Sequence, residues 1–412
     1  MEEDIIFENN TCPHVLTEKQ TEFLQSLAWW MEGFGALFIG FGGISINILA
    51  ICIILKSELR FSFFYWLLIC LEVFDTSFLL CCVLEAFRKH IGSTVIHNYV
   101  FAVFLFPFKS VVMLCSIYIT IALSVERYNA LVHPVSHRRL QRNPSRSVVE
   151  VNIQSYYKRL FKNLGPIIIF SVLFYIPRFF EVEAKVNMDG CFDEKMNTTN
   201  NCSIEYSLKA TDLRKNEAYV LWYINILNLI VTCVLPIISI IYLNCKVYFG
   251  LKRYMKRKPS IQMLKIPIDM KERINNERKE KRTKIMSDKI QQTMTLFGII
   301  IVFCVCHTLR VIMNIEEMIH SEDINYSILK NCNPWSFTFL VMVPLSEILL
   351  QINCSVNFFV YCAFNKRFKE VTFSYARNFI QCCKRLDHSS TVDVPCTNSH
   401  TGERIKLNPG QI

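Results

Sequence analysis

Seven long runs of apolar residues follow one another along the chain, and polar segments separate them. Each run is close to the ~20 residues that a helix needs to cross a lipid bilayer. The third, fifth and sixth runs continue past their apolar part as helical extensions of mixed charge. The pattern predicts an all-α membrane protein built as a bundle of seven transmembrane helices. The runs cover about residues 30–55, 63–86, 97–130, 160–180, 217–249, 288–318 and 336–363.

The segments between the runs alternate in character. Segments 56–62, 134–159 and 250–287 are basic and contain no Asn-x-Ser/Thr glycosylation sequon. Glycosylation takes place on the lumenal side of the membrane, whereas Lys and Arg accumulate on the cytoplasmic side. The two signals agree, so we expect an extracellular N-terminus and a cytoplasmic C-terminus. The sequons that we expect to be glycosylated are Asn9, Asn197, Asn201 and Asn325.

The end of the chain carries a different pattern. Apolar residues at Phe364, Phe368, Val371 and Phe373 have the spacing of an amphipathic helix that lies in the membrane interface. Cys382 and Cys383 follow it among basic residues, which makes them candidate palmitoylation sites. We therefore divide the chain into an extracellular tail (1–29), the seven-helix domain (30–363), a short eighth helix (364–381) and a disordered cytoplasmic tail (382–412). The first 26 residues do not resemble a cleavable signal peptide.

Composition supports a membrane protein. The 412 residues are 52% hydrophobic and only 19% charged, and the mean hydropathy is +0.27. A net charge of +10 is also typical of nucleic-acid-binding proteins, but here long apolar runs flank every basic block. Most of the 18 cysteines lie inside apolar runs, where they pack as small apolar side chains. Four lie in segments expected outside, and they allow three pairings: Cys12, Cys191, Cys202 and Cys332.

A charged triplet, Glu126-Arg127-Tyr128, lies at the inner end of the third run. Adjacent opposite charges stabilise a helix in lipid little, so we interpret them as a latch in which Glu126 holds Arg127. Segment 126–134, ERYNALVHP, is similar to the Asp/Glu-Arg-Tyr box of rhodopsin-like G-protein-coupled receptors. The resemblance implies that ligand binding releases Arg127 while the sixth helix moves away, which opens a cavity for a G protein. It also implies that the seventh-helix box takes part in the switch, through Asn357 and Tyr361.

Several polar side chains lie at bilayer depth, where they are costly and usually face a cavity or a partner. Asp75 in the second run has this position, together with Asn47, Ser116, Asn353 and Asn357. The set resembles the sodium-binding core of rhodopsin-like receptors, which implies an allosteric Na⁺. Hydrogen bonds between the helices would explain the same residues without an ion.

Three positions depart from the family pattern. His307 stands where the family usually has Trp, and Leu309 stands where it has the Pro that kinks the sixth helix. Ala102 stands where the family usually has the cysteine that tethers the second outer loop, so that disulfide cannot form.

Charged and polar side chains should converge near the outer third of the bundle. Lys109 occupies the place where amine receptors have an Asp, and Gln351 the place where opsins have the retinal Lys, which argues against both ligands. A mixture of both charges with aromatic residues suits a peptide. The candidate ligand-binding residues are Glu85, Lys109, Trp222, His307, Arg310, Glu347 and Gln351.

Motifs in the fourth, fifth and seventh runs look like those of invertebrate FMRFamide-type neuropeptide receptors. They are residues 177–181, 213–216, 243–244 and 353–361. This resemblance implies an amidated peptide ligand, a heterotrimeric G protein, and arrestin and kinases at the tail, all at the plasma membrane. An orphan chemosensory receptor for a small molecule is the alternative. A transporter or channel is more remote because broken helices and inverted repeats are not apparent. We see no nucleophile–base pair, metal-spaced set or phosphate loop, so we expect no enzyme.

Overall fold

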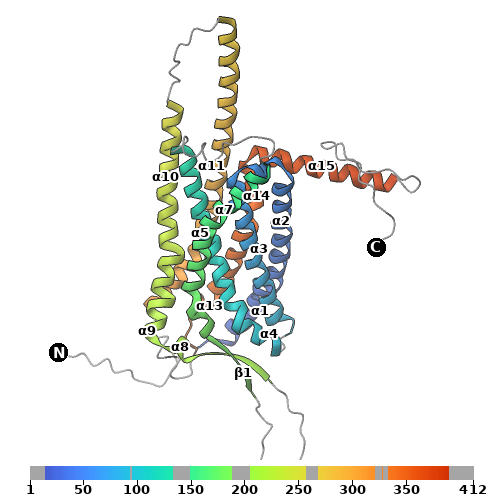
Figure 1. Cartoon of the computed structure of the whole chain (residues 1–412). Coiled ribbons are helices and arrows are strands. Elements are labelled where there is room, and N and C mark those ends of the chain that lie inside the picture. Colours follow the sequence, from blue (N-terminus) through green and yellow to red (C-terminus); the bar gives the residue numbers. More distant parts are fainter. Residues whose placement is uncertain are drawn as a thin grey trace, which may run out of the picture.

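The computed structural model describes residues 14–92, 95–132, 149–187, 205–256, 268–320, 327 and 333–388. Seven of the helical stretches in this part of the chain are long and apolar enough to cross a membrane. They stand side by side as a bundle (Figure 1), which confirms the predicted fold class. Their bounds are Glu18–Lys56, Phe63–His90, Ile96–Ala130, Tyr157–Phe180, Glu217–Gly250, Ile290–Ile319 and Phe337–Ser355.

The first half of the chain comprises α-helices, two short π-helices (η1 and η3) and two short 3-10 helices (η2 and η4). In chain order they are α1 (Glu18–Ala28), η1 (Trp29–Gly35), α2 (Ala36–Lys56), η2 (Glu58–Phe61), α3 (Phe63–His90), α4 (Val95–Val100), η3 (Phe101–Leu105), α5 (Phe106–Val132), α7 (Val149–Tyr175) and η4 (Ile176–Phe180). The first helix begins at Glu18, inside the segment that we assigned to the tail. A capping box between Thr17 and Gln20 explains this start, because each side chain bonds the other's backbone N–H.

The second half adds a hairpin and the last three spans. Its elements are β1 (Val182–Asn187), β2 (Glu205–Ala210), α8 (Asp212–Lys215), α9 (Glu217–Tyr219), η5 (Val220–Leu227), η6 (Ile230–Val234), α10 (Leu235–Lys256), α11 (Ile268–Ile319), α13 (Phe337–Ser355), α14 (Asn357–Phe364) and α15 (Lys366–His388). Strands β1 and β2 pair antiparallel, with Val182 opposite Ala210. The sequence had not indicated this hairpin.

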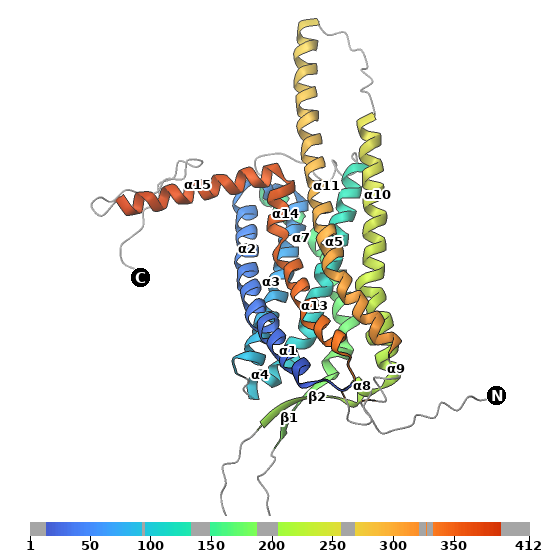
Figure 2. The ribbon, with the colours of Figure 1, turned by 180° about the vertical axis from the view of Figure 1, so that it is seen from behind.

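The bundle has two distinct ends (Figures 1 and 2). Strands β1 and β2 and the short helix α8 lie at one end, which we call the hairpin end. Helix α15 and the long extensions of α10 and α11 lie at the opposite end, which we call the α15 end. Helix α15 turns away from the bundle and runs to His388, beyond the predicted limit at residue 381.

The largest apolar cluster lies towards the α15 end. Its fully buried members include Ile54 of α2, Phe64 and Leu67 of α3, Leu123 of α5, Leu296 of α11 and Phe368 of α15. Glycines let helices approach closely, as is common in membrane bundles. A Cβ on Gly43 would lie 2.3 Å from Ser355 Oγ, and one on Gly298 would lie 2.7 Å from Val360. Dispersion forces in this packed half hold the bundle together.

The helix of the sixth span is uninterrupted, whereas that of the seventh is broken. Helix α11 is continuous over 52 residues, which fits Leu309 in place of a kinking proline. The seventh span instead divides into α13 and α14 at Val356, where φ is −95° and ψ is −4°. This break precedes Asn357, so a proline after the asparagine is not needed to interrupt the helix.

Candidate functional site

A network of ion pairs links five spans near the hairpin end. The Lys109 Nζ atom on α5 donates to Glu347 Oε2 on α13 at 2.7 Å and to Glu85 Oε2 on α3 at 3.0 Å. Lys89 bonds Glu85 at 3.2 Å and reaches Glu32 of η1 at 2.8 Å. We call Glu32, Glu85, Lys89, Lys109, Arg310 and Glu347 the charge network.

Charges balance within the charge network, three acids against three bases. Arg310 Nη1 of α11 closes the set at 3.6 Å from Glu347 Oε1. Exposed ion pairs contribute little, but a pair withdrawn from water requires both partners because an uncompensated buried charge is costly. The side chain of Lys109 is only 18% exposed. Its two carboxylate partners therefore fix the spacing of α3, α5 and α13.

A cavity of about 170 Å³ opens beside the charge network. Arg310 and Glu347 form part of its wall, and Arg178 from η4 and Arg214 from α8 add two further guanidinium groups. The remaining lining residues are Ile224, Asn228, Met313, Asn314, Glu317, Val343 and Ser346. A cavity of this kind, at the junction of helices and a loop, is a normal place for a ligand.

The other predicted ligand residues lie in three different settings. Gln351 is buried and lines a small second cavity of about 30 Å³ with Lys109. His307 is also buried but lines neither cavity; its ring lies tilted against Phe303, with centroids 4.1 Å apart. Trp222 does not join them: its side chain is 64% exposed, and it lines neither cavity. Trp222 lies within the π-helix η5.

Sequence reasoning overlooked several charged contributors to this site. Glu32 and Lys89 belong to the charge network, and Arg178 and Arg214 to the cavity. Lys89 is four residues after Glu85 on one helix, a spacing that could have revealed the pair. The two arginines are placed by the fold around the hairpin, which gives no local signal.

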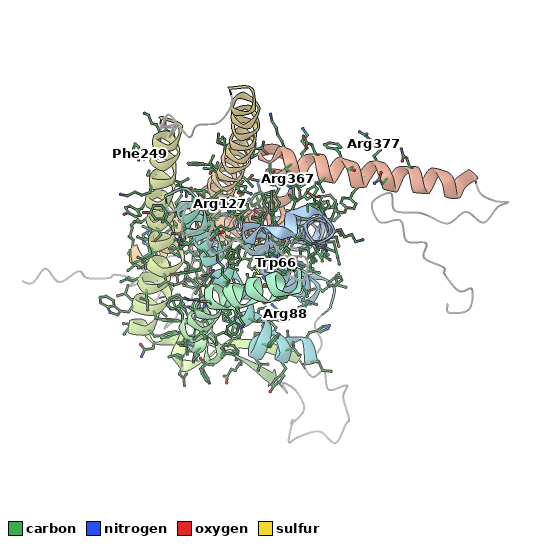
Figure 3. The ribbon with its side chains drawn as sticks, turned by 45° about the horizontal axis from the view of Figure 1, so that its top comes forward. Trp66, Arg88, Arg127, Phe249, Arg367 and Arg377 are labelled. Carbon is green, nitrogen blue, oxygen red and sulfur yellow. The ribbon has the colours of Figure 1, made fainter. Side chains whose placement is uncertain are left out.

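The missing tether at Ala102 is replaced by non-covalent contacts. Arg88, labelled in Figure 3, lies over the Phe101 ring at 4.1 Å and donates to Asn98 Oδ1 at 3.4 Å. Ala102 itself is buried. Strand β1 packs against α4 and η3, so the hairpin is held here without a disulfide to residue 102.

The predicted polar core lies deeper in the bundle, around Asp75. Ser116 Oγ donates to Asp75 Oδ1 at 2.6 Å, and Asn357 Nδ2 donates to Oδ2 at 2.7 Å. Asn47 instead bonds the Cys354 carbonyl at 3.0 Å. Asn353 is only half buried and makes no hydrogen bond to Asp75 in the part of the chain that the structure describes.

These contacts show which atoms of the polar core are available as ligands for a sodium ion. Asp75 and Ser116 offer oxygen ligands of the kind that a hard cation prefers. Asn357 presents its amide nitrogen to Asp75, and a nitrogen that donates is not a ligand for Na⁺. The alternative explanation, hydrogen bonds between helices, describes the observed contacts, and sodium binding stays a prediction.

A second buried acid lies one turn from Asp75. The carboxylate of Glu72 is fully buried, and Tyr361 donates its hydroxyl hydrogen to Glu72 Oε1 at 2.5 Å. The bond joins α3 to α14, so the switch tyrosine is tied to the second span. The sequence showed Glu72 only as an extra acid, with no indication of its partner.

Arg127 has a different partner from the one we predicted. Its guanidinium donates to the Gln292 side chain of α11 and lies over the Phe64 ring at 4.0 Å. Glu126 instead forms an ion pair with Arg159 of α7 at 2.7 Å. Side chains of adjacent residues on a helix point in different directions, so each meets a different neighbour. Tyr128, the next residue, is half buried.

The corrected latch therefore joins α5 to α11 at the α15 end. Figure 3 shows Arg127 among the helices of the bundle, whereas Arg377 lies out on α15. Hydrogen bonds to a charged group are stronger than those between neutral groups. The Arg127–Gln292 bond thus opposes separation of these two helices.

Some predicted sites lie outside the described residues. They are the glycosylation sites Asn9, Asn197, Asn201 and Asn325, and Cys12, Cys191, Cys202 and Cys332 with their open pairings. For Cys382 and Cys383 only the helical backbone of α15 is described.

The fold and the site together define a seven-helix membrane receptor, with an arginine latch at one end and a charged cavity at the other. The family model of the rhodopsin family of seven-transmembrane receptors matches residues 46–361. The chain belongs to this family and is a multi-pass membrane protein. It is also similar to the FMRFamide receptor of Drosophila melanogaster, with 26% identity over 353 residues. These cover 84% of this chain and 53% of the relative, so the chain spans about half the length of that receptor.

Proposed function

We propose that this protein is a plasma-membrane receptor for an extracellular neuropeptide of the FMRFamide type and that it activates a heterotrimeric G protein. The observation that carries the proposal is the similarity to a receptor named for FMRFamide along 84% of the chain. In this proposal the hairpin end faces the outside, with the N-terminus, and the α15 end faces the cytoplasm.

The charge network supports a peptide ligand. A basic side chain of the peptide would meet Glu347 or Glu85, and a terminal carbonyl would accept from Lys109 or Arg310. These groups are already paired with one another. A ligand that pairs with one of them must therefore release its present partner, which changes the contact between α3, α5 and α13.

The same helices carry the change to the α15 end. Lys109 and Arg127 both belong to α5, while Glu347 is on α13, just before the α14 residues Asn357 and Tyr361. A ligand that favours a new spacing at the hairpin end would strain the Arg127–Gln292 and Tyr361–Glu72 bonds. The receptor then shifts to a conformation in which these bonds are broken and α11 has moved outward.

The α15 end supplies the surface for effectors in this proposal. Helix α10 runs to Lys256 and α11 begins at Ile268, and the sequence around them is basic, as a site for a G protein or anionic lipid would be. Arrestin and kinases would act on the tail that follows α15, residues 389–412.

A receptor for a small molecule is the second candidate. The observation that favours it is the size of the cavity, about 170 Å³, since an engineered apolar cavity of ~150 Å³ binds a molecule as small as benzene. A peptide would place one side chain there and the rest over the hairpin end.

The test is activation of G proteins in membranes that contain the full chain. Synthetic amidated peptides ending in Arg-Phe-amide would be added, and nucleotide exchange on each G-protein class would be measured. We expect exchange to rise with a saturable dose response, and the same peptide with a free C-terminal acid to be weaker. A receptor that reaches the cell surface but responds to small molecules and to no peptide would contradict the peptide proposal.

A further inference from the structure

Two guanidinium groups face the cavity without an acidic partner. Arg178 and Arg214 form no ion pair within the described part of the chain. Arg178 lies over the rings of Phe106 at 5.4 Å and Tyr175 at 5.3 Å, contacts that leave its N–H groups free to donate. A cation held in a helical bundle normally has a partner.

Three buried side-chain atoms in the cavity wall have no hydrogen-bond partner: Arg178 Nε, Arg214 Nη1 and Asn314 Nδ2. All three are hydrogen-bond donors. A buried donor without an acceptor is costly, because it has lost its hydrogen bonds to water and gained none in return. Three of them around one cavity indicate that it is built for a group rich in acceptors.

The acids in the wall do not satisfy these donors. Glu347 is already bonded to Lys109 and Arg310. Glu317 lies near all three arginines, but no described ion pair joins it to them. Counting three arginines against two glutamates, the wall carries one excess positive charge.

The dimensions limit what can enter. A volume of about 170 Å³ suits one side chain or one small molecule, since ~150 Å³ holds benzene. Arginine forks match the two oxygens of a carboxylate and bond both at once.

We propose that this cavity binds a carboxylate group of the activating ligand, held by Arg178 and Arg214 with Asn314 as a further donor. The proposal rests on the proposed function in one respect only, that the hairpin end is the ligand side. The carboxylate has two sources: an Asp or Glu side chain of a peptide, or a small organic acid.

The first arm of the test compares matched peptides. Phe-Met-Arg-Phe-amide would be extended with Asp, or with its neutral isostere Asn, at one of the three positions before the tetrapeptide. We expect the best Asp peptide to be at least about tenfold more potent than its Asn partner in driving nucleotide exchange, because a charge-assisted bond replaces a neutral one.

Two variants assign that difference to the cavity. In Arg214→Gln the Asp and Asn peptides should become equal within about twofold. Lys215→Gln is the matched control: Lys215 is the next residue, its side chain is 57% exposed, and among the described residues its one ion pair is with Asp212 at 3.7 Å. The control should keep the full difference, and surface expression of both variants would be measured.

The second arm needs no signalling. Purified full-length receptor in lipid nanodiscs would be unfolded by heat with succinate or with its neutral diamide, succinamide, as the probe. We expect succinate to raise the unfolding temperature of the wild type and of Lys215→Gln, and to raise that of Arg214→Gln much less.

The outcomes separate the two proposals. If amidated peptides activate the receptor but Asp and Asn peptides are equal, and succinate gives no shift, the carboxylate site is overturned while the peptide function stands. If no peptide activates and succinate shifts only receptors with Arg214 intact, the site stands as one for a small acid and the peptide function falls. A succinate shift of equal size in Arg214→Gln would also overturn the site.

Discussion

The two ends of the bundle use polar residues in opposite ways. At the hairpin end, charged side chains form pairs that are partly exposed, and unpartnered donors face a cavity. At the α15 end, Arg127 and Tyr361 are buried and each bridges two helices by a hydrogen bond. The hairpin end therefore has hydrogen-bond donors that are free to meet a ligand. The other end is closed by bonds that must break before the helices can separate.

Helix geometry follows the same division. Spans one, three and five contain the π-type segments η1, η3 and η5 in their hairpin-end halves. Such wide turns often occur at functional sites. The largest apolar cluster lies in the other half. We therefore propose that ligand binding and release of the Arg127 latch take place at opposite ends of the bundle.

Removing the latch arginine should have the largest effect. Arg127→Ala should abolish agonist-stimulated nucleotide exchange, because the released guanidinium is the group that we expect to meet the G protein. Arg377→Ala, on the exposed face of α15, is the matched control and should signal normally. An Arg127→Ala receptor that reaches the surface and signals like the wild type would remove the distinction between the two ends.

Breaking the charge network should lower the stability of the receptor, whatever it does to ligand binding. Glu347→Gln leaves Lys109 with one carboxylate and Arg310 with none. A fully buried pair would lose about 3–5 kcal/mol. Because the side chain of Glu347 is 30% exposed, we expect a loss of about 2 kcal/mol, discounted for solvent screening, read as a lower thermal unfolding temperature.

Glu58→Gln is the control for that change. Glu58 pairs with Arg367 at 3.4 Å, but its side chain is 85% exposed. An exposed pair contributes little, so the unfolding temperature should not move measurably. Equal shifts in the two variants would show that the charge network is no more than a set of surface pairs.

The Glu72–Tyr361 bond should affect the resting state. Glu72→Leu leaves the Tyr361 hydroxyl without its acceptor, at a cost of about 1–2 kcal/mol. That corresponds to a factor of about 5–30 in a conformational equilibrium. We expect agonist-free nucleotide exchange to rise by several-fold. Glu72→Gln keeps an acceptor oxygen and should stay near the wild-type level; a rise in both variants would assign the effect to charge instead.

The smallest effect is expected at Trp222. Its exposed side chain lines neither cavity, so Trp222→Ala should change agonist potency by less than about twofold, in the ±0.5 kcal/mol range of surface substitutions. A tenfold loss of potency would return this residue to the ligand site and extend the hairpin-end site along the fifth span.

The sequence predicted the spans because a bilayer imposes a length that an apolar run must meet. It also selected Asp75 with Ser116 and Asn357, because polar groups at bilayer depth need partners. Both inferences use composition and depth alone, and neither needs the rotation of a helix. The structure brings these residues into contact.

Partners that depend on helix rotation or on distant segments were not predictable in this way. Glu126 meets Arg159 only because α7 packs beside α5. Whether Trp222 meets a cavity depends on the rotation of the fifth span, and its exposed side chain lines neither cavity. Arg214 reaches the cavity because the chain after β2 folds over the bundle.

Opening of the Arg127–Gln292 bond is best measured as a change in the distance between α5 and α11. Spin labels on non-natural amino acids at Val125 and Ser287, both exposed, would avoid the 18 native cysteines. Double electron–electron resonance would then compare the resting receptor with Gln292→Ala, which removes the partner of Arg127. We predict that the distance lengthens in Gln292→Ala without any ligand and that agonist-free nucleotide exchange rises with it. An unchanged distance together with raised exchange would contradict the proposal that this bond holds the receptor closed.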